Sequence, residues 1–240
     1  MKLIDEYAGL HWQMTTCEKF AMQDILRRLS PDVAIEIGTY QGGSLQVLSH
    51  FAQQVVSIDI EPSVPERLSA QFGNVEFHTG PSSILLPDIW RSYIAQNRRI
   101  EFLLIDGDHS AQGVRRDIAA LLSVRPNTRC IVLMHDSFNP DCREGIRSAA
   151  WADCEYVHSL ELDFIPGIFH EHAYDTAAAG SMWGGFACAV IEHRARQHTL
   201  TVQASQQALF EAVLRASCYA SSPSWRSKIK TLASRIGVWR

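Results

Sequence analysis

The stretch Val33-Ala34-Ile35-Glu36-Ile37-Gly38-Thr39-Tyr40-Gln41-Gly42-Gly43-Ser44 decides the fold. In it an apolar run ends in a glycine-rich turn, and a helical pattern begins near Ser44. A second apolar run, residues 55–59, then closes on the acid Asp59. This order is typical of a βαβ unit that binds a nucleotide, because glycines let the backbone approach a ligand and the acid receives a ribose hydroxyl.

The residue sequence of the turn discriminates between classes of cofactor. A dinucleotide-binding turn reads G-x-G-x-x-G, whereas this one places Glu36 two residues before Gly38. A carboxylate there would repel a pyrophosphate but suits the cationic methionine end of S-adenosylmethionine. Gly42 and Gly43 would leave room for the ligand, and Ser44 would lie near a helix N-terminus that binds a carboxylate. The alternative is a glycine-rich loop in a generic α/β protein.

Short apolar runs alternate with helical patterns along most of the chain. This alternation predicts an α/β fold of the Rossmann-like, doubly wound kind, with a mostly parallel seven-stranded sheet and an antiparallel edge hairpin. We expect strands at 33–37, 55–60, 75–78, 102–105, 130–134, 155–164 and 185–192, and helices at 44–52, 65–72, 82–96 and 113–122. Residues 1–30 form a predicted helical lead-in, 31–195 the cofactor-binding domain and 196–240 a helical extension.

Composition places the chain among ordinary globular proteins. It is 46% hydrophobic and 20% charged, and its net charge of −4 gives no indication of nucleic-acid binding. The six cysteines are scattered without a C-x-x-C pair, as in a reducing compartment. Acids near the N-terminus argue against a signal peptide, and no apolar run reaches the roughly 18 residues of a membrane span. We therefore expect a cytoplasmic protein.

The segment 224–240 is basic and amphipathic. It carries five cationic residues, and its apolar residues recur at a spacing that lines one face of a helix. One interpretation is a terminal helix docked on the domain or on a second subunit of a homo-oligomer. The other is weak contact with an anionic membrane surface or with a partner protein.

From about residue 33 to residue 190 the chain resembles a class I S-adenosylmethionine-dependent methyltransferase, and within that class the metal-dependent O-methyltransferases. Glu36-x-Gly38-x-Tyr40-x-Gly42-x-Ser44 matches the catechol-type turn. The run 38–44, together with Ile105-Asp106-Gly107-Asp108-His109-Ser110, is more similar to the branch of macrolide-sugar O-methyltransferases and proteins labelled cephalosporin hydroxylase. Tyr40 replaces the middle glycine of the general turn, a departure that this branch tolerates.

The resemblance implies a reaction and a set of cofactor contacts. The reaction is methyl transfer from S-adenosylmethionine to a hydroxyl of a sugar or another small natural product. Tyr40 and Ser44 would help hold the methionine carboxylate, Asp59 would take the ribose, and Ser82 would lie beside the adenine. The cofactor contacts that we expect are Glu36, Gly38, Thr39, Tyr40, Gly43, Ser44, Asp59, Ser82 and Asp106.

Acids and a histidine end two neighbouring strands of the predicted sheet. Asp106 ends the fourth strand and His135-Asp136 end the fifth, and the carboxyl ends of such strands open onto the ligand crevice. We expect Asp106, His135 and Asp136 to hold a divalent cation, with Mg²⁺ favoured by the oxygen ligands. Related enzymes usually carry an acid where this chain has His135, so Mn²⁺, Fe²⁺ or Zn²⁺ stays open, as does a strand-end role without metal.

His109 is the predicted catalytic residue. It follows Asp106 by three residues, and a neutral imidazole there can take the proton from an acceptor hydroxyl. In the macrolide-sugar branch a histidine at this offset is the proposed base; the alternative is a loop histidine that caps the next helix.

Two other functions stay open: a non-catalytic S-adenosylmethionine-binding protein and a metal-dependent hydroxylase. We expect the connection 165–184, with Phe169 and Trp183, to close over the substrate.

Overall fold

Helices and strands alternate along the chain, as the sequence pattern predicts. The computed structural model describes residues 9–171 and 179–221. Its main elements are α1 (Thr16–Leu29), β1 (Val33–Ile37), α2 (Leu45–Phe51), β2 (Gln54–Asp59), α3 (Ser63–Leu68), β3 (Val75–Thr79), α4 (Ser82–Ala95), β4 (Ile100–Ile105), α5 (Ala111–Leu122), β5 (Cys130–His135), α6 (Pro140–Ser148), β6 (Val157–Ile165), β7 (Ile168–His170), β8 (Ser181–Trp183), β9 (Phe186–Ile191), β10 (Thr201–Gln203) and α7 (Gln207–Ala216).

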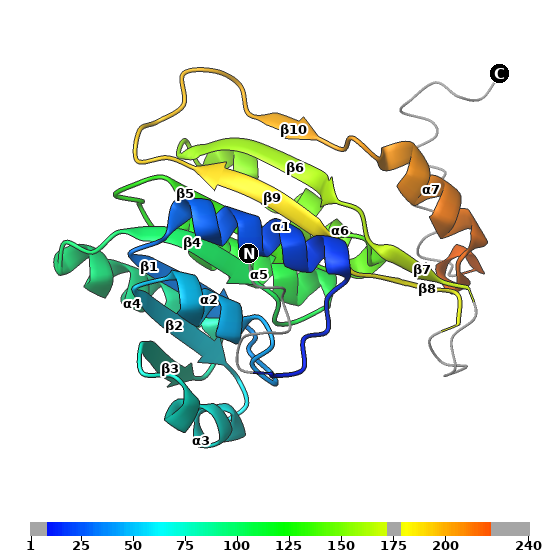
Figure 1. Cartoon of the computed structure of the whole chain (residues 1–240). Helices are drawn as coiled ribbons and strands as arrows, with labels where there is room; N and C mark the ends of the chain where they lie inside the picture. The colour runs from blue at the N-terminus through cyan, green and yellow to red at the C-terminus, as the bar shows by residue number, and fades with distance from the viewer. Residues whose placement is uncertain (1–8, 172–178, 222–240) are drawn as a thin grey trace.

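One eight-stranded sheet, in the order β10-β6-β9-β5-β4-β1-β2-β3, forms the centre of the molecule (Figure 1). β9 runs antiparallel to β5 and β6, and the other pairs are parallel. The Rossmann-like, mostly parallel fold is thereby confirmed. The strand beyond the seven expected is β10, which pairs with β6 at the sheet edge. Its three residues are all exposed, so no burial pattern marks it in the sequence.

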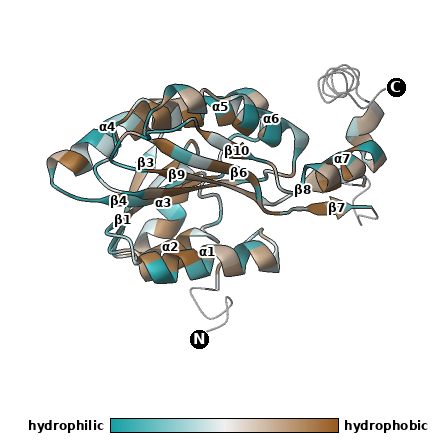
Figure 2. Cartoon of the chain, turned by 90° about the horizontal axis from the view of Figure 1, so that it is seen from above, coloured by the Kyte–Doolittle hydropathy of each residue, from teal (hydrophilic) through white to brown (hydrophobic). Residues whose placement is uncertain are grey.

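Helices cover both faces of the sheet: α4, α5 and α6 lie on one side, and α1 and α2 on the other (Figure 2). All five residues of β1 are buried, as a central parallel strand requires. Val33 and Ile35 pack in the cluster that contains α4 and α5, whereas Ala34 packs in the cluster that contains α1 and α2. The carboxyl end of β1, where the glycine turn begins, is therefore held from both sides.

The register of the sheet brings the predicted site residues to one level. Ile37 pairs with Ile58 of β2 and Ile105 of β4, and Ile105 pairs with Met134 of β5. The next residue on each strand therefore stands at the same edge, and these residues are Gly38, Asp59, Asp106 and His135.

The late part of the chain differs most from the expectation. β7 and β8 pair as a separate antiparallel hairpin inside the connection that we expected to be a long loop. Helix α7, within the predicted extension, packs through Phe210 and Leu214 against Phe138 and Met182. The predicted basic segment 224–240 lies outside the described residues. Within the described ranges, no helix is long and apolar enough to cross a membrane.

Candidate functional site

A cavity of about 1490 Å³ opens at the carboxyl edge of the sheet. Ligand pockets usually measure about 300–1,000 Å³, so this cavity has room for a cofactor and a second molecule. The predicted site residues that line it are Gly38, Thr39, Tyr40, Gly43, Ser44, Asp59, Ser82, Asp106, His109, His135 and Asp136. Of the predicted cofactor contacts, Glu36 alone is not part of the lining.

The shape of the glycine turn is imposed by its protein neighbours. Gly38 has a φ of +84°, and a Cβ there would lie 2.1 Å from the carbonyl oxygen of Asp106. A Cβ on Gly43 would lie 2.4 Å from the carbonyl oxygen of His11, and one on Gly42 would meet the side chains of Leu10 and Leu68. The room that we expected beside Gly42 and Gly43 for a ligand is therefore filled by the N-terminal segment and by α3.

Glu36 supports the turn from beneath. Its side chain is fully buried, and its carboxylate accepts hydrogen bonds from Thr39 Oγ1, at 2.8 Å, and from Ser44 Oγ. Burial raises the pKa of Glu36 to about 8, although the two hydroxyl donors act in the opposite direction. In this structure Glu36 fixes two hydroxyls of the turn, and its direct contact with a cofactor stays a prediction.

Glu36→Gln is expected to change how stability depends on pH. Because the folded-state pKa is raised above the ordinary value of 4.5, the protonated carboxyl stabilises the fold below that value, and this contribution is lost as the pH rises through about 8. Between these two pH values the free energy of unfolding of the wild type should fall by about 1.4 kcal/mol per pH unit from this group. The neutral amide of the variant should remove this contribution. Urea unfolding of both proteins from pH ~5 to ~8 measures the difference, and parallel curves would contradict the assignment.

Asp59 stands at the end of β2, inside the cavity. Its Oδ2 accepts from the backbone N–H of Thr39, at 2.8 Å, and of Tyr40, at 3.0 Å. Its Oδ1 accepts from the N–H of Glu61 at 2.9 Å. The turn and the acid thus form one hydrogen-bonded unit, and the carboxylate is fixed before any ligand binds.

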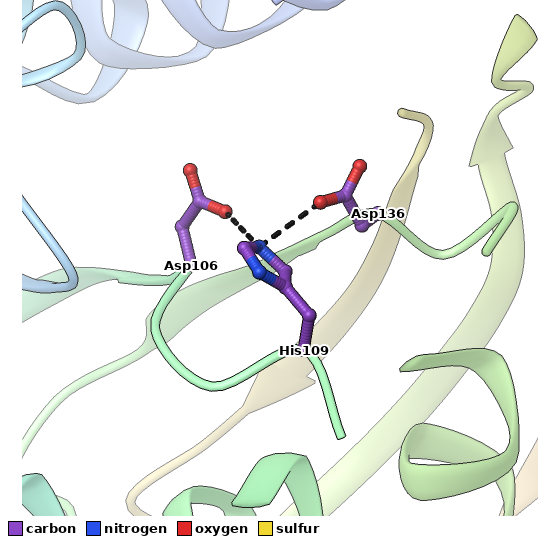
Figure 3. A group of neighbouring side chains, drawn as sticks. All are labelled: Asp106, His109 and Asp136. Atoms are coloured by element: carbon purple, nitrogen blue, oxygen red, sulfur yellow. Dashed lines mark ion pairs between the residues drawn. The ribbon is translucent and has the colours of Figure 1, made fainter. Parts of the chain in front are cut away.

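Asp106, His109 and Asp136 form a cluster at the ends of β4 and β5, with the imidazole between the two carboxylates (Figure 3). His109 Nε2 lies 3.5 Å from Asp106 Oδ1 and 3.1 Å from Asp136 Oδ2. Hydrogen bonds to Asp106 and Asp136 raise the pKa of His109 to about 10, so the imidazole carries a proton in this arrangement. Trp183 of β8 packs edge-to-face on His109, with the ring centroids 5.7 Å apart.

The cluster has the composition of a cation site. One ligand atom from each of Asp106, His109 and Asp136 lies within 4.8 Å of the others, and Asp136 is buried. Burial alone would raise the pKa of Asp106, but His135 and His109 lower it to about 2, so a carboxylate is available for a metal. Asp136 adopts a φ of 56°, a sparsely populated conformation of the kind found at functional sites.

His135 stands beside this cluster, and its role as a metal ligand stays a prediction. Its Nδ1 lies 2.9 Å from Asp106 Oδ1 and its Nε2 lies 3.1 Å from Glu18 Oε1, so carboxylates engage both ring nitrogens. Among the described residues, the group that can hold a metal ion contains His109 in the place where we expected His135. His135 Nδ1 also lies 3.6 Å from Asp136 Oδ2, so the His135 ring connects the two strand-end carboxylates with Glu18 of α1.

Glu18 is the site residue that the sequence reasoning missed. It is fully buried on α1, and its carboxylate accepts from Thr15 N, at 2.5 Å, and from Gly185 N in addition to its contact with His135. Thr15 and Glu18 form a capping box, which is a recognisable local signal. The contact with His135 spans 117 positions, and no local pattern reveals it.

Glu18→Ala is expected to destabilise the fold by about 3–5 kcal/mol, because it leaves the buried His135 without one of its carboxylate partners. Glu66 is a matched control, since it also lies in the first turn of a helix but is exposed. Glu66→Ala should leave the free energy of unfolding nearly unchanged. Urea unfolding of the two variants tests the contrast, and equal losses would contradict it.

Part of the connection 165–184 borders the cavity, and its closure over a substrate stays a prediction. Trp183, Ile168 and His170 line the cavity. Phe169 packs instead against the cluster of Phe138 and Phe210, so of the two aromatic residues that we expected over the substrate, Trp183 is the one that lines the cavity.

Comparison with known proteins finds a family model and solved structures that are similar to this chain. Residues 35–137 match the family model described as a methyltransferase domain. No curated protein sequence matches the chain. The matched range runs from β1 to the end of β5, the part of the chain that carries the glycine turn, Asp59 and Asp106.

Solved structures share the fold at low sequence identity. The O-methyltransferase from Bacillus cereus in complex with SAH is 18% identical, with a TM-score of 0.50, and the match covers 75% of this chain and 83% of that one. TomG from Streptomyces achromogenes, an O-methyltransferase involved in tomaymycin synthesis and solved with SAM, is 16% identical, with a TM-score of 0.52 and coverages of 75% and 81%. Cofactor-bound Rv0187 from MTB is 15% identical, with a TM-score of 0.54 and coverages of 78% and 85%.

Proposed function

We propose that the protein transfers a methyl group from S-adenosylmethionine to a hydroxyl of a small acceptor, a sugar or another natural product. The observation that carries the proposal is that one cavity is lined both by the predicted cofactor residues and by the cluster of Asp106, His109 and Asp136. The similar O-methyltransferases from Bacillus cereus and Streptomyces achromogenes support a hydroxyl as the acceptor.

On the cofactor side, the chain supplies a prearranged surface. Asp59 would accept from the ribose hydroxyls with a carboxylate that Thr39 and Tyr40 already hold in place. The hydroxyl of Ser44 and the backbone of the turn would face the methionine end. Because these groups need no rearrangement, binding fixes the direction of the methyl group relative to the cluster.

On the acceptor side, Asp106 and Asp136 would hold a divalent cation, for which their oxygens favour Mg²⁺. A bound cation would act as a Lewis acid that lowers the pKa of the acceptor hydroxyl. Carboxylates that held a cation would no longer accept the hydrogen bonds that raise the pKa of His109. His109 Nε2 can then accept the hydroxyl proton, and the bulk of Trp183 helps exclude water.

A metal-dependent hydroxylase is the less favoured alternative. Non-haem iron oxygenases use two histidines and one carboxylate. The metal-competent group in the described part of the chain has one histidine and two carboxylates, which suits a hard cation better.

The test is a transfer assay with methyl-labelled S-adenosylmethionine and a panel of hydroxylated sugars and phenols. We expect labelled product that a chelator abolishes and that Mg²⁺ restores. Calorimetry with S-adenosylhomocysteine runs in parallel. Cofactor binding without transfer to any hydroxylated acceptor would favour a non-catalytic binding protein and contradict the proposal.

A further inference from the structure

Asp117 of α5 is a buried acid on the cavity wall that the reaction described above does not use. It is 5% exposed and lines the cavity. Its Oδ1 accepts from Ser82 Oγ at 2.5 Å, whereas Oδ2 forms no hydrogen bond within the described part of the chain. Oδ2 lies beside Gly107, where an added Cβ would stand 3.6 Å from it. Because Asp117 lines the cavity and Oδ2 is not among the fully buried atoms that lack a partner, this oxygen is open to a hydrogen-bond donor from a ligand.

Asp117 is connected to Asp59 through the segment 80–83. The backbone N–H of Gly80 donates to the carbonyl oxygen of Asp59 at 2.9 Å, which holds the loop 80–83 against the end of β2. Ser82 of this segment is the first residue of α4 and donates to Asp117. Gly107 and Asp117 line the same cavity as Asp59 and this segment, so a base attached to a ribose at Asp59 would have them as its wall. Ile60, which is 69% exposed and lines the same cavity, offers an apolar surface to the base.

The side chains of this wall favour a purine base that carries an exocyclic amine. Its side chains along the loop are Pro81 and the hydroxyls of Ser82 and Ser83. Asp117 adds a carboxylate, which accepts hydrogen bonds and donates none when ionised. Burial raises the pKa of Asp117, but the Ser82 hydroxyl opposes this effect by stabilising the ionised form. An acceptor at this place matches an exocyclic amine and disfavours a carbonyl oxygen.

We propose that Asp117 Oδ2 accepts a hydrogen bond from the exocyclic amine of the cofactor's adenine, so that Asp117 selects an adenosyl cofactor over its 6-oxopurine counterpart. The inference rests on the proposed function, because it takes S-adenosylmethionine as the cofactor. Asp117 is a specificity residue in this account and takes no part in methyl transfer.

The experiment compares the Kd of S-adenosylhomocysteine with that of S-inosylhomocysteine, measured by calorimetry on the full chain. Wild type should prefer the adenosyl ligand. Asp117→Asn keeps the volume and can still accept from Ser82, but its amide can donate to a carbonyl oxygen. We expect this variant to reduce the preference by roughly 10- to 100-fold, the range for a hydrogen bond to a charged group.

Asp108→Asn is the matched control, because Asp108 also lines the cavity but is exposed; it should leave the preference unchanged. Thermal unfolding establishes that each variant is folded. Ser82→Ala retains Asp117 but removes its hydroxyl partner, and it should reduce the preference by a smaller factor.

The outcomes separate this inference from the proposed function. Wild type that binds both ligands equally overturns the role of Asp117 without any variant. An unchanged preference in Asp117→Asn, or a loss in Asp108→Asn instead, also overturns it. Wild type that binds neither ligand contradicts the proposed cofactor itself.

Discussion

His109→Ala is expected to lower kcat by roughly 10²- to 10⁴-fold, the range for loss of a general base, while the affinity for S-adenosylhomocysteine stays unchanged. The imidazole contacts Asp106, Asp136 and the Trp183 ring, whereas Asp59, the predicted ribose contact, stands at the end of β2. Its side chain is 48% exposed, so its removal should have little effect on stability. Transfer kinetics and calorimetry on the same preparations separate the two quantities.

The same variant distinguishes a base from a metal ligand. If His109 is the base, the Mg²⁺ concentration that gives half-maximal activity should be the same in wild type and variant. If His109 is a third ligand, that concentration should rise. His78→Ala is a suitable control, because His78 is paired with Glu76 on β3 and does not line the cavity. Wild-type activity in His109→Ala would contradict both roles.

The sequence was sufficient for the parts of the fold that local burial determines. Val33–Ile37 is a strand with the predicted bounds, because a strand buried on both faces must be apolar along its length. Helix α6 was not predicted, although Asn139 caps it and Pro140 begins it, a known start signal. The signal stands in a polar segment with no long apolar stripe, and periodicity alone does not reveal such a helix.

The composition of the candidate site could be predicted, but the direction of its side chains could not. Strand-end positions placed Asp106, His135 and Asp136 together correctly. His109 and His135 both contact the two carboxylates, and the His135 ring is held in addition by Glu18 of the lead-in helix. Asp117 looks like any acid of an amphipathic helix until its contact with Ser82 is known. Such contacts are decided by tertiary packing between distant segments.

Gly38→Ala is expected to abolish cofactor binding and to destabilise the fold by about 3–5 kcal/mol, from an unfavourable left-handed backbone together with overpacking. The added Cβ would stand 2.1 Å from the backbone oxygen of Asp106 and 2.8 Å from the Cα of Gly107. Both obstacles are backbone, so no side-chain rotation relieves them. β1 and β4 would have to separate at their carboxyl ends, where the turn, Asp59 and Asp106 meet.

Gly73→Ala is the matched control, because no atom lies within 4 Å of the Cβ it would add and its φ is not in the left-handed region. It should leave both stability and cofactor affinity near those of wild type. At a site with free space, alanine changes stability mainly by lowering the conformational entropy of the unfolded chain. Urea unfolding and calorimetry with S-adenosylhomocysteine on the two variants test the pair. Tight binding by Gly38→Ala would mean that the end of β1 can move away from β4 without loss, and the turn would then not fix the cofactor relative to the cluster of Asp106, His109 and Asp136.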